Sequence, residues 1–286
     1  MSQQTLKTLN EMLRNSVRLY GDRTAFKVKK EGKFVPITYK EFYNRVEKFG
    51  TGLLKIGIEK FDHIGLVSDN RFEWIIADMA IIGLRAVDVP CSGDSSPHDI
   101  YFKLHHSDAK AAILEGEKQF SKFFSLAKDL PQIKNIILLD RIKMFSEKED
   151  APEWAIPIGF EEDGKVSKKL YNELCSLIKN NNKYIFLSKE AKDYLDKYLE
   201  KNTNKLLKET HSTETTDSVK NKLLRKTVII NKNFNETHHY KIYYFPRIIQ
   251  IGEELLAKGD TQFDEISKSG QPDDLTTIIY TSGTTA

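Results

Sequence analysis

The sequence has little cysteine, no long hydrophobic run and no signal for export. Its 286 residues contain only Cys91 and Cys175, too few for a disulfide framework or a cysteine-based zinc site of ordinary spacing. No stretch approaches the ~18 consecutive apolar residues of a transmembrane helix, and the polar N-terminus lacks the apolar run of a signal peptide. These absences predict a protein of a reducing compartment, the cytoplasm.

The charges also lack an excess of one sign. The 44 Lys and Arg residues against 41 Asp and Glu residues leave a formal net charge of +3, and the charges are interspersed along the chain. Such a balance creates no strong field for a polyanion, so we predict no nucleic-acid partner.

A few residues are candidates for metal binding or nucleophilic chemistry. Adjacent histidines, at His105-His106 and His238-His239, point apart on a helix or strand, and no carboxylate or cysteine stands at a supporting spacing. We therefore predict no metal site. Cys91 has no base placed near it by the sequence, so we interpret it as a buried or loop thiol.

Short apolar strands alternate with amphipathic helices over the first 140 residues. Capping signals mark helix starts at Thr38–Glu41, Asn70–Glu73 and Ser96–Asp99, where a side chain near the helix start satisfies free N–H groups. A helix over residues 6–21 and a hairpin around Glu31-Gly32 precede them. Further strands are expected at HIGLVS, RAVDVP, KAAILE and KNIILLD.

This alternation predicts an α/β fold with doubly wound, layered sheets and helices on both faces, because parallel neighbours are joined by right-handed crossovers. Residues 1–140 form the first α/β part. Residues 141–239 are rich in Lys and Asn and read as a mostly helical insertion, and residues 240–286 resume the α/β pattern. In this last part a strand, YKIYYF, precedes a helix with Pro246 in its first turn and a final strand, LTTIIY.

The chain ends in TTIIYTSGTTA, a strand followed by a turn crowded with hydroxyls. Residues Thr281, Ser282, Gly283, Thr284 and Thr285 offer four hydroxyls and backbone N–H groups, and Gly283 adopts positive φ at little cost. At the carboxyl end of a strand in an open α/β sheet, such a loop is placed to wrap an anion. It lacks the Walker pattern, and its composition alone also fits an ordinary Ser-Gly turn.

LTTIIYTSGTT resembles the nucleotide-phosphate loop of the adenylate-forming enzymes, whose signature reads Y-T-S-G-T-T-G. Tyr280–Thr285 match it without a gap. The phrases SDNRFEW and GLRAVDVP, within a longer stretch that begins ITYKEFYNRV, resemble the early region of the long-chain acyl-CoA ligase branch. The likeness covers about Leu6–Asp140 and Tyr240–Thr285.

The resemblance implies a long-chain fatty acid CoA ligase, which uses ATP, Mg²⁺ and coenzyme A and makes acyl-CoA through an acyl-adenylate. It implies that Thr281, Ser282, Gly283, Thr284 and Thr285 bind the ATP phosphates, and it assigns no catalytic residue. The fatty acid is the implied substrate, and the basic amphipathic helices of the insertion are a candidate for peripheral contact with a membrane.

Residue 286 is Ala where the family has Gly, and the family's later motifs are not in the sequence. We therefore expect a truncated N-terminal fragment that is inactive alone and binds neither ATP, Mg²⁺ nor coenzyme A tightly. Two alternatives stay open: a non-catalytic remnant or interaction module with the same fold, and another adenylate-forming subfamily. The sequence does not indicate an oligomeric state.

Overall fold

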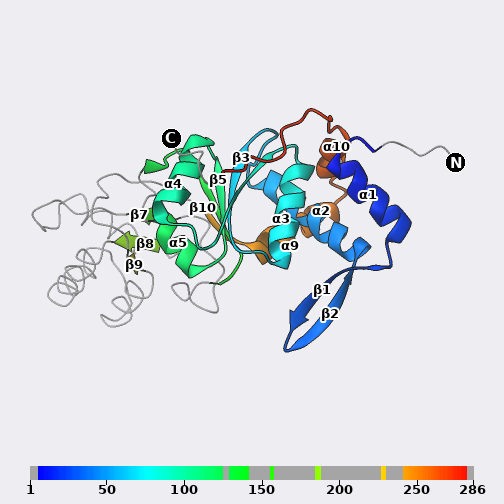
Figure 1. Ribbon diagram of the computed structural model, residues 1–286, viewed down its shortest axis with the longest axis horizontal. Coiled ribbons are helices and arrows are strands. Elements are labelled where there is room, and N and C mark those ends of the chain that lie inside the picture. Colours follow the sequence, from blue (N-terminus) through cyan, green and yellow to red (C-terminus); the bar gives the residue numbers. More distant parts are fainter. Residues whose placement is uncertain are drawn as a thin grey trace, which may run out of the picture.

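The computed structural model describes residues 6–124, 129–141, 155–157, 184–187, 227–229 and 241–281 (Figure 1). Its helices are α1 (Leu9–Tyr20), α2 (Tyr39–Lys55), α3 (Phe72–Gly83), α4 (Pro97–His106), α5 (Glu117–Phe124), α9 (Phe245–Leu256) and α10 (Gln262–Lys268). Its strands are β1 (Thr24–Lys30), β2 (Lys33–Thr38), β3 (His63–Val67), β4 (Val87–Cys91), β5 (Ala111–Leu114), β6 (Asn135–Leu138), β7 (Ala155–Pro157), β8 (Tyr184–Leu187), β9 (Thr227–Ile229) and β10 (Lys241–Tyr244).

A five-stranded parallel sheet in the order β10-β6-β5-β3-β4 forms the centre of the described structure. The chain passes from β3 to β4 on one side and then returns to β5 on the other side of β3. This reversal makes the fold doubly wound, as predicted. Strand β10 completes the sheet by pairing in parallel with β6, which lies about 100 residues earlier in the chain.

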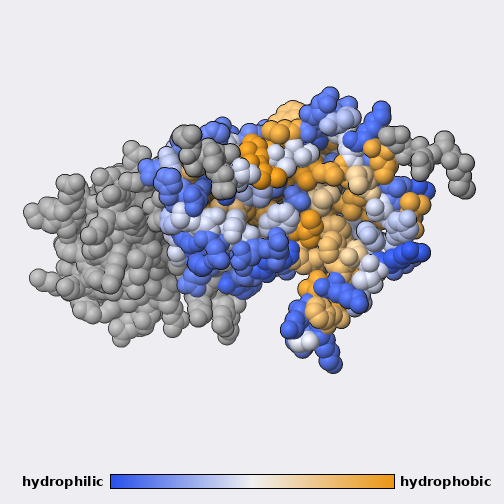
Figure 2. Space-filling model, in the orientation of Figure 1, coloured by the Kyte–Doolittle hydropathy of each residue, from blue (hydrophilic) through white to orange (hydrophobic). Residues whose placement is uncertain are grey.

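Helices cover both faces of this sheet (Figure 1). One apolar core lies under α2, α3 and α9, and a second lies under α4 and α5. In the view of Figure 2, hydrophilic residues cover α4 and α5, whereas hydrophobic residues gather over α3 and its neighbours. Trp74, Ile75 and Met79 of α3 are partly buried and pack against the first of these cores.

Helices α2 and α9 cross at glycines. A Cβ added to Gly252 would lie 1.8 Å from the carbonyl oxygen of Lys48, and one added to Gly52 would lie 2.2 Å from that of Ile248. Only glycine leaves room for two backbones this close. The crossing therefore fixes α9, and with it the chain that follows, against the first part of the fold.

Two of the three predicted helix caps form, and one does not. Thr38 and Ser96 each begin a helix with a complete capping box, as predicted. The prediction for Asn70 was wrong, because Arg71 is the N-cap of α3 and makes no side-chain capping bond. Glu73 instead accepts a hydrogen bond from Nε of Arg71 at 2.8 Å. An ion pair with the neighbouring arginine thus replaces the expected cap.

The predicted hairpin is confirmed and projects from the body of the molecule (Figure 1). Its two turn residues, Glu31 and Gly32, have φ values of 48° and 80°. Positive φ at both positions is the requirement of a type I′ turn, whose twist matches the two strands. Phe26 packs its ring on Phe42 and Phe72, with centroids 4.9 and 5.6 Å away, and so fixes the base of the hairpin.

Three short parallel strands, β7, β8 and β9, lie within residues 141–239, for which a mostly helical insertion was predicted. The predicted helices of that range fall outside the described residues, so the boundaries of the insertion stay a prediction. Helix α10, which follows α9, was not predicted from the sequence. No helix in the described ranges combines the length and the apolar character needed to cross a membrane.

Candidate functional site

The segment Leu275–Thr281, which leads into the hydroxyl-rich loop, runs along the outer edge of β4. The backbone N–H of Asp88 donates to the carbonyl of Thr276 at 2.9 Å, and the N–H of Ile278 donates to the carbonyl of Asp88 at 2.8 Å. These bonds make one parallel bridge between Asp88 and Thr277. The predicted parallel direction is confirmed, but the expected strand over residues 275–280 is reduced to this bridge.

Pro90 explains why the pairing is so short. In a parallel ladder the next donor on β4 after Asp88 is the backbone N–H two residues later, and that residue is Pro90, which has no N–H. Proline on an edge strand ends the ladder at that point. The segment is thus held by backbone hydrogen bonds near its start, and side chains position its end.

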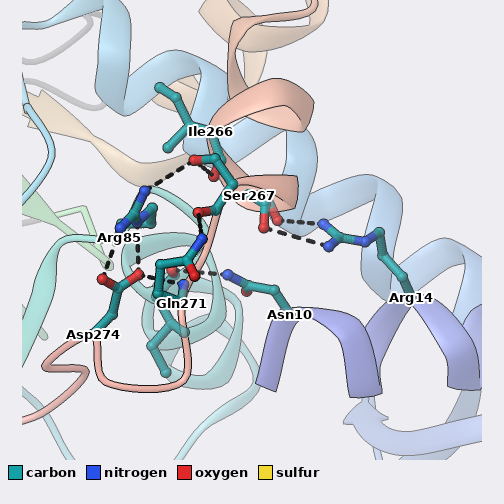
Figure 3. A network of polar contacts seen from close by, with 9 residues as sticks. Asn10, Arg14, Arg85, Ile266, Ser267, Gln271 and Asp274 are labelled. Atoms are coloured by element: carbon teal, nitrogen blue, oxygen red, sulfur yellow. Dashed lines mark hydrogen bonds and ion pairs between the residues drawn. The ribbon is translucent and has the colours of Figure 1, made fainter. Parts of the chain in front are cut away.

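Arg85 and Asp274 anchor the start of the segment (Figure 3). Nε and Nη2 of Arg85 donate to the two carboxylate oxygens of Asp274 at 2.6 and 2.7 Å. Both side chains are largely buried, with 10% and 15% of their surfaces exposed. The hydrogen bonds from Arg85 hold the pKa of Asp274 below its ordinary value. Because the pair is bidentate, it fixes both the position and the orientation of the chain at residue 274.

The same network ties α1 to α10 (Figure 3). Nη1 of Arg14 donates to the hydroxyl of Ser267 at 2.7 Å, and the amide of Asn10 donates to the carbonyl of Ile82 at 3.2 Å. A cavity of about 190 Å³ lies beside these contacts, between the start of α1 and residues 270–276. Since Arg85 and Ala86 line it just before β4 begins, it lies at the amino end of that strand, away from the loop.

Tyr280, the first residue of the loop signature, docks on α4. Its hydroxyl lies 2.7 Å from Nδ1 of His106, and its ring meets the rings of Phe102 and His106 edge-on at 5.7 and 5.6 Å. Burial raises the pKa of the Tyr280 hydroxyl. Thr281 follows in an exposed position, and Ser282–Thr285 lie outside the described residues. The structure therefore describes the approach to the predicted phosphate loop and its first residue.

A buried carboxylate lies beneath this approach. Asp88 is 2% exposed, accepts a hydrogen bond from the side chain of Thr277, and has no hydrogen-bond partner at Oδ1. Burial, with a smaller contribution from the negative charge of Asp78, raises the pKa of Asp88 to about 8. Burial also raises the pKa of Asp78 on α3 to about 6. Sequence reasoning missed this pair, although an aspartate within the apolar strand RAVDVP is its signal.

The carboxyl ends of β3 and β5 meet at the point where the winding of the sheet reverses, where α/β folds commonly bind ligands. Here the chain's own groups fill that position. Oε2 of Glu115 accepts from the backbone N–H of Asp69 at 2.8 Å, and Oδ1 of Asp69 accepts from the N–H of Gly93 at 3.2 Å. These contacts join the loops after β3, β4 and β5, and the sequence analysis did not foresee them.

Arg71 links the same edge to β6. Its two terminal nitrogens donate to the carboxylate oxygens of Asp140, each at 2.8 Å, while Nε donates to Glu73. The hydrogen bonds that Arg71 donates to Asp140, and then the one to Glu73, raise the pKa of Arg71 above its already high value. These carboxylates thus already accept hydrogen bonds from donors of the protein itself. Within the described ranges no group of three or more metal-ligating side chains comes together.

The other residues considered from the sequence lie apart from this site or outside the described ranges. His105 contacts the ring of Tyr101 rather than Tyr280. Cys91 is confirmed as a buried thiol at the end of β4, 3% exposed. Cys175 and the pair His238-His239 fall outside the described residues.

Comparison with known proteins assigns the family. The family model described as AMP-binding enzyme matches residues 13–286, nearly the whole chain. The chain belongs to the AMP-binding enzyme family. The match includes every strand of the central sheet and continues through the hydroxyl-rich loop.

Among individual AMP-binding relatives, a long-chain-fatty-acid–CoA ligase of Xenopus laevis is 25% identical over 183 residues, which cover 60% of this chain and 24% of that protein. One of Gallus gallus is 30% identical over 138 residues, covering 48% of this chain and 18% of that protein. A solved long-chain-fatty-acid-CoA ligase from Archaeoglobus fulgidus is 17% identical, with a TM-score of 0.43, over 48% of this chain and 28% of that one. The chain thus matches about a quarter or less of the length of these curated relatives.

Proposed function

We propose that the chain is the N-terminal part of a long-chain fatty acid CoA ligase, an enzyme that joins a fatty acid to coenzyme A with ATP through an acyl-adenylate. The observation that carries the proposal is the family match, which runs through the sheet into the intact YTSGTT signature at Tyr280–Thr285. The names of the Xenopus and Gallus relatives support a long-chain acid as substrate.

In this proposal the loop holds the phosphates of ATP. The hydroxyls of Thr281, Ser282, Thr284 and Thr285 and the backbone N–H groups around Gly283 are donors, as an anion requires. Donors fixed in place before the reaction stabilise the charge that develops on phosphate oxygens and align phosphorus with an attacking carboxylate. The contacts of Asp274, Thr277 and Tyr280 with the rest of the chain support such a fixed approach.

The described residues do not fit the Mg²⁺ that the family uses with ATP. The carboxylates at the carboxyl edge of the sheet have protein donors as partners, and no cluster of three ligands forms among the described residues. We therefore assign no metal ligand in this chain and propose no step for it through the metal. Nor do we assign a coenzyme A site.

The proposal is tested by assaying the complete polypeptide that the gene encodes. If the coding sequence continues beyond codon 286, in any frame, into Pro-Lys-Gly and the later motifs, the complete polypeptide should catalyse palmitate-dependent exchange of pyrophosphate into ATP. The 286-residue chain alone should show none, because one loop does not supply the barrier reduction that adenylation needs. Robust exchange by the 286-residue chain would contradict its proposed dependence on further residues.

Two other functions would give different results. If no further ligase motifs follow and ATP does not bind, a non-catalytic module that keeps the fold is the better description. If the complete polypeptide exchanges pyrophosphate with an aryl or amino acid and not with palmitate, it belongs to another adenylate-forming subfamily. Assaying a panel of acids of each class separates these outcomes.

A further inference from the structure

The hairpin formed by β1 and β2 is unusual in its charge. Residues 24–38 contain four lysines, Lys27, Lys29, Lys30 and Lys33, and one acidic residue, Glu31. Their net charge of +3 equals the net charge of the whole chain, so the remaining residues carry equal numbers of basic and acidic side chains. The hairpin is thus a cationic element that projects from the body of the molecule (Figure 1).

Among the described residues, the four lysines have no acidic partner. All four are exposed, and no described carboxylate lies within ion-pair distance of their ammonium groups. Lys48 on α2, by contrast, pairs with Glu253 at 2.5 Å. The hairpin therefore presents a cationic surface that is complementary to an anionic partner.

Apolar side chains lie among these lysines. Phe34 is 67% exposed and Val35 is 37% exposed. The strand register pairs Phe34 with Lys29 and Val28 with Val35, so Phe34 shares a face with the ammonium stem of its cross-strand neighbour. A single exposed phenylalanine is common on proteins, but one placed beside uncompensated lysines at the end of a projecting hairpin is not explained by the core.

Phe26 and Val28 attach the base of the hairpin to the core. Both are partly buried and pack against the core formed with α2 and α3, which holds the base of the hairpin rigid. Phe34, which pairs with Lys29, lies one residue pair nearer the turn at Glu31-Gly32 than the Val28–Val35 pair and is 67% exposed. The element therefore has a rigid base and an apolar, cationic tip.

We propose that the β1–β2 hairpin docks on an anionic lipid surface, with Phe34 inserted among the headgroups and the lysines against lipid phosphates. Each basic side chain close to an anionic bilayer strengthens binding of the protein to that bilayer about fivefold. An aromatic ring favours the boundary between headgroups and acyl chains. A lipid surface accounts for both features. RNA bases also stack on aromatic rings, so the test below includes a soluble polyanion and a readout specific to insertion among lipids. The inference is independent of the ligase reaction.

Sedimentation with vesicles tests this docking. The 286-residue chain should bind vesicles of phosphatidylcholine with 30% phosphatidylglycerol more tightly than phosphatidylcholine alone, and binding should weaken as salt rises. The double variant Lys29→Glu, Lys30→Glu should bind at least about tenfold more weakly. The matched control Lys134→Glu, Lys258→Glu makes the same change of charge at exposed lysines elsewhere and should change binding much less. Equal losses in the two double variants, or no vesicle binding by the wild type, would overturn the proposal.

Insertion of the ring has its own readout. Phe34→Ser should reduce vesicle binding several-fold at constant charge. Tryptophan at that position, in Phe34→Trp, should retain binding, shift its emission to shorter wavelength on anionic vesicles and be quenched by brominated acyl chains. A bound Phe34→Trp chain whose emission does not change, or a wild type that binds heparin as tightly as vesicles, would indicate a general polyanion site and reject the lipid assignment. Circular dichroism spectra of all variants establish that each is folded.

Discussion

Two regions hold the segment that leads to the phosphate loop, and they use different forces. Before the segment, Phe263 of α10 is 1% exposed and lies on α2 and α3, where a Cβ at Gly50 or Gly83 would come within 2.1 or 2.5 Å of its ring. Along the segment itself, a few polar side chains of β4 and α4 make the contacts. Close packing places the helices, whereas the polar contacts place the segment that leads to the proposed phosphate loop.

The two regions should differ in how they unfold. A ring packed on two helices is released only when the helices separate, so its contribution belongs to global unfolding. An edge segment with a single bridge and a handful of side-chain contacts opens locally at lower free energy. Substitutions in the first region should therefore change global stability, and substitutions in the second should change the local stability of residues 274–281.

The largest expected effect is in the packed region. Phe263→Ala removes a buried ring and leaves a cavity between α2, α3 and α10, so the free energy of unfolding should fall by about 3–5 kcal/mol. Urea denaturation followed by circular dichroism measures it. Ile266→Ala, on the same helix and in its last turn, provides a comparison at a less central position. A loss below about 1 kcal/mol for Phe263→Ala would show that α10 does not anchor the segment by packing.

The anchor between Arg85 and Asp274 should have the next largest effect. Asp274→Asn keeps the shape of the side chain but presents an amide group to a guanidinium, and hydrogen bonds to charged groups contribute about 1–3 kcal/mol. We expect a loss in that range and faster hydrogen exchange at Ile278, whose N–H bonds to Asp88. The neighbouring exposed residue provides the control, since Asp273→Asn should change neither quantity. Equal effects of the two substitutions would argue against the anchor.

Asp88 makes the second region sensitive to pH. Burial raises its pKa to about 8, whereas an unfolded aspartate has a pKa of about 4, so the folded chain binds more protons than the unfolded chain between these values. The stability from the protonated carboxyl is fully present below about pH 4 and is lost as pH rises through about 8. The wild type should therefore lose stability over this range.

Asp88→Asn removes that loss because an amide does not ionise. Above about pH 8 the variant should be more stable than the wild type, by an amount on the order of 1–2 kcal/mol, and its melting temperature should depend less on pH. Thermal denaturation from about pH 4 to 9 measures both. Asp273→Asn should keep the slope of the wild type. Identical slopes for the wild type and Asp88→Asn would contradict the buried, proton-holding carboxyl.

Local sequence patterns predicted the elements well, and long-range partners account for what they missed. Strand alternation, the capping boxes at Thr38 and Ser96 and the hairpin turn depend on residues close in sequence, so each was predictable. The helix α10 has only Phe263 and Ile266 as apolar residues in seven, too few for a periodic signal. Its burial depends on glycines about 180 and 213 positions earlier, which no local pattern reveals.

The candidate site also combines features that the sequence predicts with contacts that only the fold brings together. The hydroxyl-rich loop was visible as a motif, and the parallel direction of the preceding segment followed from the α/β order. The pairing of that segment is short because of Pro90. The sequence alone does not show this, since the strand register is needed to place Pro90 at the next donor position. Arg85 and Asp274 are separated by 189 residues, so only the fold brings them together.

The smallest expected effect concerns Tyr280 and His106. His106→Ala removes one hydrogen-bonding partner at an exposed site, so we expect a local loss of about 0.5–1.5 kcal/mol, seen as roughly two- to tenfold faster exchange of the amide at Ile278 with global stability unchanged. Tyr280→Phe keeps the ring on Phe102 and should give the same increase, while His105→Ala should give none because His105 contacts Tyr101. If His105→Ala and His106→Ala behave alike, the contact with α4 does not hold the approach to the loop. If only His106→Ala and Tyr280→Phe loosen it, the first residue of the signature is positioned by a side chain 174 residues earlier in the chain.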